Sequence, residues 1–256
     1  DKASPCDSSS KKATESDLAA ILFTSGTTGK AKGVMLTHSN LISDCFLAQD
    51  LLTVLPTDVF YALLPIHHSY TMLAVFIEAI SVGAEIVFGK KLIVTQILKE
   101  LKKGKVTMFL AVPMLFNKML KGLMNGIREK GVLVYGLIRF LMMISGVIKK
   151  ITKKNVGHKM FNGLLAKLSL DNIRIAICGG GPLPSSTFKM FNELGIDFVQ
   201  GYGLTETSPI ITLNPIEAYI ERSVGKVLPR TEMKILDPDD RGIGEIAVKG
   251  PMVMQG

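Results

Sequence analysis

Residues 173–203 read IRIAICGGGPLPSSTFKMFNELGIDFVQGYG, and they contain the repeating unit of the fold. The apolar run at 173–178 ends at the glycine-rich turn 179–182, as a buried strand does before a turn. A helix is predicted over 185–194 and a strand over 198–200, ahead of a second glycine turn. This order of elements indicates an α/β fold with parallel strands, whose ligand-binding loops lie at the carboxyl ends of the strands.

The same alternation extends in both directions along the chain. Further strands are predicted at 18–24 (a buried one), 33–37, 59–63, 85–88 and 106–112. Helices are predicted at 39–52 with Ser39 as N-cap, at 72–81, at 92–102 and as a hairpin over 114–168. After residue 219 the short runs 232–236 and 244–249 predict a small β-rich part. The predicted class is α/β, with central parallel-rich sheets flanked by helices. The predicted segments are 1–16 as a linker or fragment edge, 17–218 as the core and 219–256 as a β-rich subdomain.

Composition restricts the class of protein but not its partner. Of 256 residues, 47% are hydrophobic and 20% charged, which is typical of a globular protein. Thirty Lys and Arg against 22 Asp and Glu give a net charge of +8, which favours nucleotides, coenzyme phosphates, acidic membranes or nucleic acid. Nucleic acid is not expected, because no aromatic residues alternate with the basic ones and tryptophan is absent. Cys6, Cys45 and Cys178 form no C-x-x-C pair, so a cytoplasmic, reducing compartment is expected.

Residues 132–148 (VLVYGLIRFLMMISGVI) are mostly apolar and precede a basic run at 149–154. A membrane-spanning helix needs about 20 apolar residues, whereas this stretch is shorter and carries Arg139 near its middle. The preferred interpretation is a helix buried in the protein. The second interpretation is a helix that rests on an anionic membrane surface, which would make the protein membrane-associated.

Residues 24–33 (TSGTTGKAKG) combine four hydroxyl side chains, three glycines and two lysines after a predicted strand. Glycines let backbone N–H groups approach an anion, hydroxyls donate hydrogen bonds and lysine adds charge, so the loop is suited to phosphate. A Walker A loop is excluded at two positions, by Thr24 in place of glycine and Ala31 in place of Ser or Thr. A flexible surface loop is the alternative, and the flanking predicted strands disfavour it.

The string ILFTSGTTGKAKGVMLTHSN at 21–40 closely resembles the signature loop of the AMP-forming superfamily of acyl-CoA synthetases, luciferases and peptide-synthetase adenylation domains. In that family the loop holds the β- and γ-phosphates of ATP. The resemblance implies this role for Thr24, Ser25, Gly26, Thr27, Thr28, Gly29 and Lys32. Proline is usual at the position of Ala31, and this departure frees one backbone dihedral without abolishing the expected chemistry.

Two downstream strings resemble the nucleotide-binding motifs of the same family. GGGPL at 179–183 resembles its adenine-binding turn, and QGYGLTET at 200–207 its Y-G-x-T-E motif. The implied nucleotide contacts are Gly180, Gly181, Pro182, Gly201, Tyr202 and Gly203. Thr205 and Glu206 are the implied catalytic residues, Thr205 bonding a phosphate and Glu206 binding Mg²⁺. Aromatic stacking on a base and a carboxylate beside phosphate oxygens suit these roles. A dinucleotide-binding G-x-G-x-x-G motif is excluded, because Glu206 occupies its last position.

Two weaker matches complete the resemblance over about 17–256. LPIHHSY at 64–70 resembles the LP-x-x-H element beside the family's acyl pocket, which implies substrate binding by His68; a packed structural histidine is the alternative. GEIAVKGP at 244–251 resembles the strand that closes the large domain.

The resemblance implies ATP-dependent activation of a carboxylic acid to acyl-AMP and then to acyl-CoA, with ATP, Mg²⁺ and coenzyme A as cosubstrates and cofactor. The apolar and basic segment between Pro113 and Ile173 resembles that of long-chain fatty-acyl-CoA synthetases. A long-chain fatty acid is therefore expected, with medium-chain or aromatic acids as alternatives.

The family's ribose-binding aspartate and catalytic lysine are expected beyond residue 256. A fragment of the large N-terminal domain is therefore predicted, with weak or no adenylation by itself. From another class of function, a non-catalytic nucleotide-binding module is the alternative.

Overall fold

The computed structural model describes residues 12–25 and 30–256. The strands are β1 (Leu18–Thr24), β2 (Lys32–Thr37), β3 (Val59–Ala62), β4 (Glu85–Phe88), β5 (Met108–Ala111), β6 (Ile175–Cys178), β7 (Asp197–Gly203), β8 (Ile210–Leu213), β9 (Lys226–Val227), β10 (Glu232–Leu236) and β11 (Glu245–Lys249). The helices are α1 (His38–Gln49), α2 (Ser69–Thr71), the π-helix η1 (Met72–Ile77), α3 (Glu78–Val82), α4 (Val94–Lys103), α5 (Pro113–Arg128), α6 (Val132–Thr152), α7 (Gly157–Met160), α8 (Asn162–Lys167), α9 (Ser185–Glu193) and the 3₁₀ turn η2 (Thr205–Thr207).

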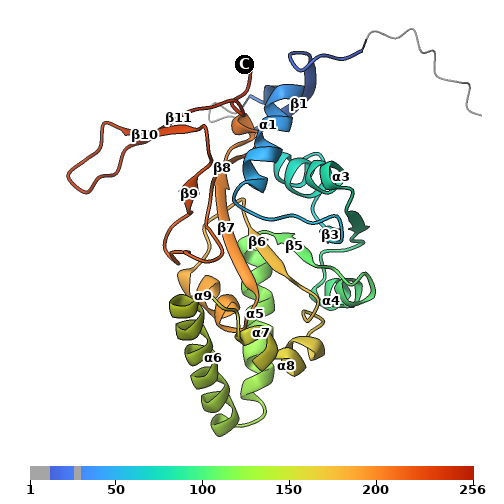
Figure 1. Ribbon diagram of the computed structural model, residues 1–256, viewed down its shortest axis with the longest axis vertical. Coiled ribbons are helices and arrows are strands. Elements are labelled where there is room, and N and C mark those ends of the chain that lie inside the picture. The colour runs from blue at the N-terminus through green and yellow to red at the C-terminus, as the bar shows by residue number, and fades with distance from the viewer. Residues whose placement is uncertain (1–11, 26–29) are drawn as a thin grey trace, which may run out of the picture.

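A seven-stranded sheet in the order β4-β3-β5-β6-β7-β8-β9 organises the molecule (Figure 1). The first five strands are parallel to one another. Strand β8 runs antiparallel to β7, and β9 runs antiparallel to β8. Helices connect the parallel strands, as parallel pairing requires. Two antiparallel pairs, β1–β2 and β10–β11, lie outside this sheet. The predicted α/β class and parallel-rich sheet are therefore confirmed.

The parallel strands are covered on both faces, which explains why β5 and β6 are buried along their whole length. Successive side chains point to opposite faces, so each strand contributes to two cores. One core joins Phe109 and Phe198 to α4, α5, α6 and α9. The other joins Phe60, Met108 and Ile177 to η1 and α3.

The N-terminus of α1 differs from the prediction, because Thr37 rather than Ser39 is the N-cap. The Thr37 hydroxyl accepts the Asn40 N–H at 3.2 Å, and Asn40 Oδ1 accepts the Thr37 N–H at 3.0 Å. This reciprocal capping box satisfies two N–H groups that the helix itself leaves free. The Asn40 side-chain amide also donates to the carbonyl oxygens of Pro251 and Val253.

Two predicted burial patterns are wrong. The strand at 18–24 is not buried, since Leu18, Ile21 and Phe23 of β1 are 46%, 48% and 75% exposed. The apolar segment at 132–148 does form a helix, α6, but its outer face is exposed. Only 17% of the most apolar window of α6 is buried, although its length and composition would suffice to cross a membrane.

The second predicted glycine turn is also wrong, because Gly201 and Gly203 belong to β7. This strand pairs with β6 through its first half and with β8 through its second half. The strands β8 and β9 were not predicted from the sequence. Since β9 extends the main sheet from within residues 219–256, the division at 218 stays a prediction.

Asp58 joins the amino ends of three parallel strands at the sheet edge opposite the glycine turns. Its carboxylate accepts the Leu55 N–H at 2.8 Å, the Thr107 hydroxyl at 2.7 Å and the Arg174 guanidinium. Burial raises the pKa of Asp58, but these hydrogen bonds outweigh it and hold the pKa below its usual value of 3.8. The stabilisation is therefore complete above that value and is lost as the pH falls through the lower pKa of the folded state.

We predict that Asp58→Asn lowers the free energy of unfolding at neutral pH by about 1–3 kcal/mol, the range for hydrogen bonds to charged groups and unsatisfied partners. The difference from wild type should shrink in acid below the usual Asp58 pKa, where the wild-type carboxylate is also protonated. Urea unfolding at a series of pH values measures this difference in the free energy of unfolding, and Asp240→Asn, at an exposed position, is the control. A difference that stays constant with pH would contradict the ionic role of Asp58.

Candidate functional site

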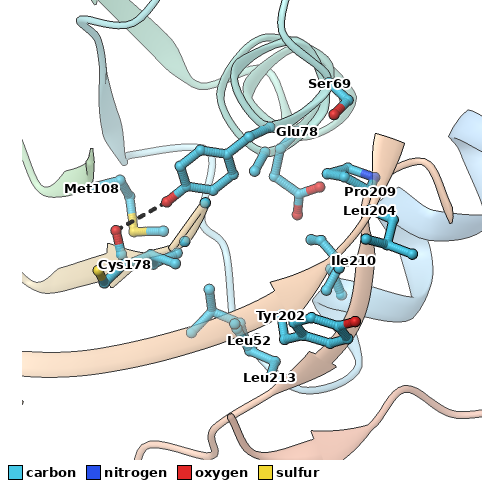
Figure 2. Close-up of a pocket in the computed structure, with 18 of the residues that line it drawn as sticks. Leu52, Ser69, Glu78, Met108, Cys178, Tyr202, Leu204, Pro209, Ile210 and Leu213 are labelled. Atoms are coloured by element: carbon cyan, nitrogen blue, oxygen red, sulfur yellow. Dashed lines mark hydrogen bonds between the residues drawn. The ribbon is translucent and has the colours of Figure 1, made fainter. Parts of the chain in front are cut away.

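A cavity of about 210 Å³ lies where β6 and β7 approach α2 and η2 (Figure 2). Its wall combines backbone-rich glycine segments with a larger apolar surface. The lining residues are Ala48, Leu52, Val54, Phe60, Ser69, Tyr70, Ala74, Glu78, Met108, Ile177, Cys178, Gly179, Gly180, Gly201, Tyr202, Gly203, Leu204, Thr205, Pro209, Ile210 and Leu213. The cavity lies at the carboxyl ends of the strands, where α/β proteins bind ligands.

Tyr70 of α2 forms the part of the cavity wall that faces β6. Its hydroxyl donates to the Ile177 carbonyl oxygen at 3.0 Å, the bond drawn in Figure 2. Its ring lies so close to Gly179 that a Cβ there would be 3.2 Å from ring carbons. Burial raises the pKa of Tyr70 well above its usual 10.0, and burial raises the pKa of Cys178 to about 12. Both groups are therefore neutral near pH 7, and this part of the wall is uncharged.

The end of β7 depends on the absence of a side chain at Gly203. A Cβ at this position would be 1.6 Å from the Pro209 carbonyl oxygen, and one at Gly201 would be 3.2 Å from the Thr212 oxygen. Glycine therefore lets the chain pass from β7 through η2 and return as β8 within a few residues. This tight return places Tyr202 and Thr205 on the same cavity wall.

The hydroxyls near η2 link the two sides of the cavity mouth. Ser69 Oγ lies 3.4 Å from Thr205 Oγ1. Thr207 Oγ1 accepts the Leu204 N–H at 3.1 Å and so stabilises the turn that carries Thr205. The cavity is thus lined by hydroxyl groups of Ser69 and Thr205 and by the aromatic ring of Tyr202, a combination suited to an oxyanion and a base.

Glu206 is half-buried on η2, next to the β1–β2 hairpin. Its carbonyl oxygen accepts the Met254 N–H at 2.8 Å, and the backbone of Met35 in β2 bonds to Gln255 and Gly256. Lys32 begins β2 and pairs with Thr24 at the end of β1. Both ends of the predicted phosphate loop are thus held on the hairpin that contacts η2.

The predicted phosphate-loop residues do not line the cavity where they are described. Thr24, Ser25 and Lys32 lie on or beside the hairpin and are not among the lining residues. The predicted contacts Gly26, Thr27, Thr28 and Gly29 lie outside the described residues.

The described residues contain no group of three or more His, Cys, Asp or Glu that could hold a metal ion. Mg²⁺ beside phosphate, however, usually takes one or two carboxylates and completes its shell with phosphate and water oxygens. The half-buried carboxylate of Glu206, the residue after Thr205 in η2, fits that binding mode.

The other predicted contacts divide between the cavity wall and its surroundings. Gly180 lines the cavity with φ +75°, a left-handed conformation that favours glycine, whereas Gly181 and Pro182 follow it beyond the wall. His68 is exposed, and its ring is tilted against that of His67, with ring centroids 4.5 Å apart. Its neighbours Ser69 and Tyr70 line the cavity instead, so the substrate role of His68 stays a prediction.

The apolar wall was missed by the sequence analysis. It is built largely by the strand face that carries Phe60, Met108 and Ile177. Leu213 at the end of β8 and Leu52 from the segment after α1 add to it. Apolar residues of this kind are expected in any buried strand, so no local signal separates those lining a cavity from those packing a core.

Glu78 supplies a carboxyl group to this otherwise apolar wall, directed into the cavity in Figure 2. The Cys45 thiol donates to Glu78 Oε2 at 2.8 Å. Burial raises the pKa of Glu78, and the hydrogen bond from Cys45 only partly opposes this. A lone acid in the apolar run 72–80 (MLAVFIEAI) was the available sequence signal.

Comparison with known proteins finds relatives along nearly the whole chain. The profile of a family described as AMP-binding enzyme matches residues 1–256. Long-chain-fatty-acid–CoA ligase 1 of Cavia porcellus is 30% identical over 257 residues, covering 94% of this chain and 36% of the relative. The chloroplastic long-chain-fatty-acid–[acyl-carrier-protein] ligase of Arabidopsis thaliana is 27% identical over 281 residues, covering 94% and 38%.

A solved structure shares the fold. O-succinylbenzoate coenzyme A synthetase of Bacillus subtilis, in complex with ATP and magnesium ion, has a TM-score of 0.68 and 26% identity. The match covers 95% of this chain and 43% of that one. The chain therefore spans 36–38% of the length of the two curated relatives.

We predict that Gly203→Ala destabilises the protein by more than about 3 kcal/mol, the upper end of ordinary overpacking costs. The reason is that a backbone oxygen, unlike a flexible side chain, cannot move aside without shifting β8. The control is Gly126→Ala in α5, where a Cβ meets nothing within 4 Å. That change should stabilise the helix by about 0.5–1 kcal/mol. Equal unfolding free energies for the two variants would contradict the proposed constraint.

Proposed function

This chain belongs to the family of AMP-binding enzymes, and on that basis we propose that it binds ATP and a carboxylic acid for conversion to an acyl-adenylate. The observation that carries the proposal is a single cavity with two chemically different parts. Glycine backbone, Tyr202 and Thr205 form one part, and apolar side chains form the other. A nucleotide and the tail of an acid can thereby meet at the boundary between them.

In the proposed reaction, an oxygen of the substrate carboxylate attacks the α-phosphorus of ATP. The new oxygen–phosphorus bond forms as the bond to pyrophosphate breaks. Tyr202 faces the adenine, Thr205 donates a hydrogen bond to a phosphate oxygen, and Lys32 adds positive charge near the leaving group. No covalent nucleophile from the protein is required, because positioning and charge stabilisation lower the barrier.

Bound Mg²⁺ would neutralise charge on the phosphates, with Glu206 as its protein ligand. In the second proposed step a thiol sulfur attacks the acyl carbonyl carbon, and AMP leaves. Coenzyme A is the proposed thiol, in line with the name of the Cavia porcellus relative. A carrier-protein thiol is the alternative, since the Arabidopsis thaliana relative is named for that acceptor.

A long-chain fatty acid is the proposed substrate. The apolar wall can pack an alkyl chain against Phe60, Met108 and Ile177, and burying each methylene is worth about 0.8 kcal/mol. Both curated relatives are named for long-chain fatty acids. Aromatic or medium-chain acids are the alternatives, and the Bacillus subtilis neighbour is named for an aromatic acid.

We predict that Glu206→Gln slows acid-dependent ATP–pyrophosphate exchange by the protein containing this chain about 10- to 100-fold. Contacts to charged groups are worth roughly 1.5–3 kcal/mol, and each 1.36 kcal/mol corresponds to tenfold in rate. The variant should also need more Mg²⁺ for half-maximal exchange. Glu245→Gln, an exposed change on β11, is the control.

Exchange by the wild-type protein distinguishes an adenylating enzyme from a non-catalytic nucleotide-binding module. Exchange that depends on a carboxylic acid supports an adenylating enzyme. Nucleotide binding without exchange, for every acid in a graded series, would instead indicate a non-catalytic nucleotide-binding module.

We predict that Ala74→Phe shortens the preferred acid. Ala74 lines the cavity and is 9% exposed, so a phenyl ring there fills space that an alkyl chain would use. In the wild type, kcat/KM should rise about fourfold for each added methylene, the equivalent of about 0.8 kcal/mol. In the variant this rise should stop at a shorter chain.

The ratio of kcat/KM between chain lengths is the measurement, because it does not depend on the fraction of folded enzyme. Ala13→Phe, an exposed position, is the control. An unchanged chain-length profile for Ala74→Phe would contradict the assignment of the apolar wall to the acid.

A further inference from the structure

The helix α6 presents apolar side chains to solvent along one stripe. Leu133, Leu137, Phe140, Val147 and Ile151 are 89%, 59%, 55%, 51% and 75% exposed. Their spacing of three, four or seven residues places them on one side of a helix. Soluble proteins rarely expose so long a row of large apolar residues, and such rows indicate an interaction surface.

The opposite side of α6 is part of the protein core. Met142, Ser145, Gly146 and Lys149 are buried, and the helix packs against α9 and α5. Lys149 Nζ donates to Asn192 Oδ1 and to Asp197 Oδ1, each at 2.7 Å. A helix fixed in this way cannot be surrounded by lipid, so α6 does not cross a membrane as placed here.

Arg139 does not interrupt the apolar stripe. Its guanidinium lies 3.9 Å from the buried Glu193 carboxylate of α9, on the protein side of the helix. Lys150, which also lies within α6, is bonded to Glu221. The charged residues within α6 are therefore directed toward protein partners and away from the exposed stripe.

The positive charge of the chain is concentrated around the same helix. Residues 113–172 contain eleven Lys and Arg against two Asp and Glu, while the rest of the chain contains 19 against 20. The net charge of +8 thus arises entirely from the segment that holds α5 to α8. Exposed lysines flank the C-terminal end of the stripe, at Lys153, Lys154 and Lys159.

We propose that α6 lies in the surface of an anionic lipid bilayer, with its apolar stripe among the acyl chains and the flanking lysines at the headgroups. Peripheral helices of this kind combine buried apolar area with attraction to anionic lipid. A second copy of the chain is disfavoured as the occupant, because stripe-to-stripe contact would bring two strongly basic segments together. Figure 1 shows α6 beside α9 at the outer edge of the helical layer, where a planar surface can reach it.

Vesicle flotation of the protein containing this chain tests the proposal, and it requires no substrate. The protein should float with phosphatidylcholine vesicles that contain phosphatidylserine, less with pure phosphatidylcholine, and less as salt is raised. The double variant Leu137→Ser, Phe140→Ser should weaken partitioning about 10-fold or more. Phe88→Ser is the matched control, because Phe88 is 62% exposed on the edge strand β4.

Two further variants separate the apolar from the electrostatic contribution. Lys153→Glu with Lys154→Glu should weaken binding to anionic vesicles about 10-fold or more and leave binding to neutral vesicles unchanged. The chain contains no tryptophan, so Phe140→Trp adds a reporter within it, and the emission difference between the variant and the wild type should shift to the blue when anionic vesicles are added. That shift reports entry of the stripe itself into an apolar phase.

Three results would overturn the proposal. The first is a wild-type protein that does not bind anionic vesicles, and the second is binding that the Leu137→Ser, Phe140→Ser variant retains in full. The third is self-association, or capture of an acidic protein partner, that this variant abolishes while vesicle binding is absent. Because the assay contains neither ATP nor acid, its failure leaves the proposed reaction untouched.

Discussion

The close approach of Gly203 to Pro209 is the constraint on which the site depends. Only a residue without a Cβ allows β7 to turn through η2 and return as β8 at this distance. Strand β7 is parallel to β6 in its first half and antiparallel to β8 in its second, so it is the last strand of the parallel part of the sheet. Its second half carries Tyr202 and leads into η2, which carries Thr205. The hydrogen bond from Met254 to Glu206 then ties this turn to the segment that pairs with β2. The close contact of Gly203 with Pro209 is therefore needed both for the sheet and for the site.

The apolar part of the cavity has a different origin. Phe60, Met108 and Ile177 belong to the core on one face of the sheet, and the same side chains form the cavity wall. A wall made of strand residues is rigid, because each side chain is held by neighbours on two adjacent strands. Glu78 is the exception, with a carboxyl group held by Cys45 and a pKa raised by burial. Burial therefore makes ionisation of this carboxyl group less favourable than in water, in the part of the wall where an alkyl chain would lie.

The sequence predicted most of the parallel sheet, because short apolar runs bounded by Gly or Pro are typical of buried strands. The strands at 18–24, 85–88 and 232–236 have the predicted bounds, although only 85–88 lies in the parallel sheet. The errors arose where side-chain capping or strand pairing, and not the apolar run itself, decides the bounds of an element. Thr37 became the N-cap because Asn40 completes its capping box, and β7 continued through two glycines because β8 pairs with it. Motif residues were found by resemblance, but the apolar wall was not, since its residues look like any core strand.

The helix α6 shows why composition alone could not identify a partner. A charge of +8 spread evenly over the surface would indicate little beyond solubility. Here the whole excess lies within residues 113–172, and the helix in that segment turns its charged Arg139 and Lys149 inward while Leu133 and Phe140 face solvent. An exposed apolar stripe usually lowers solubility. Lysines at the end of the stripe can keep the protein in solution by mutual repulsion and attract it to an anionic surface, where the stripe leaves water. The two properties together, and neither one alone, favour a lipid headgroup layer over a neutral or basic partner.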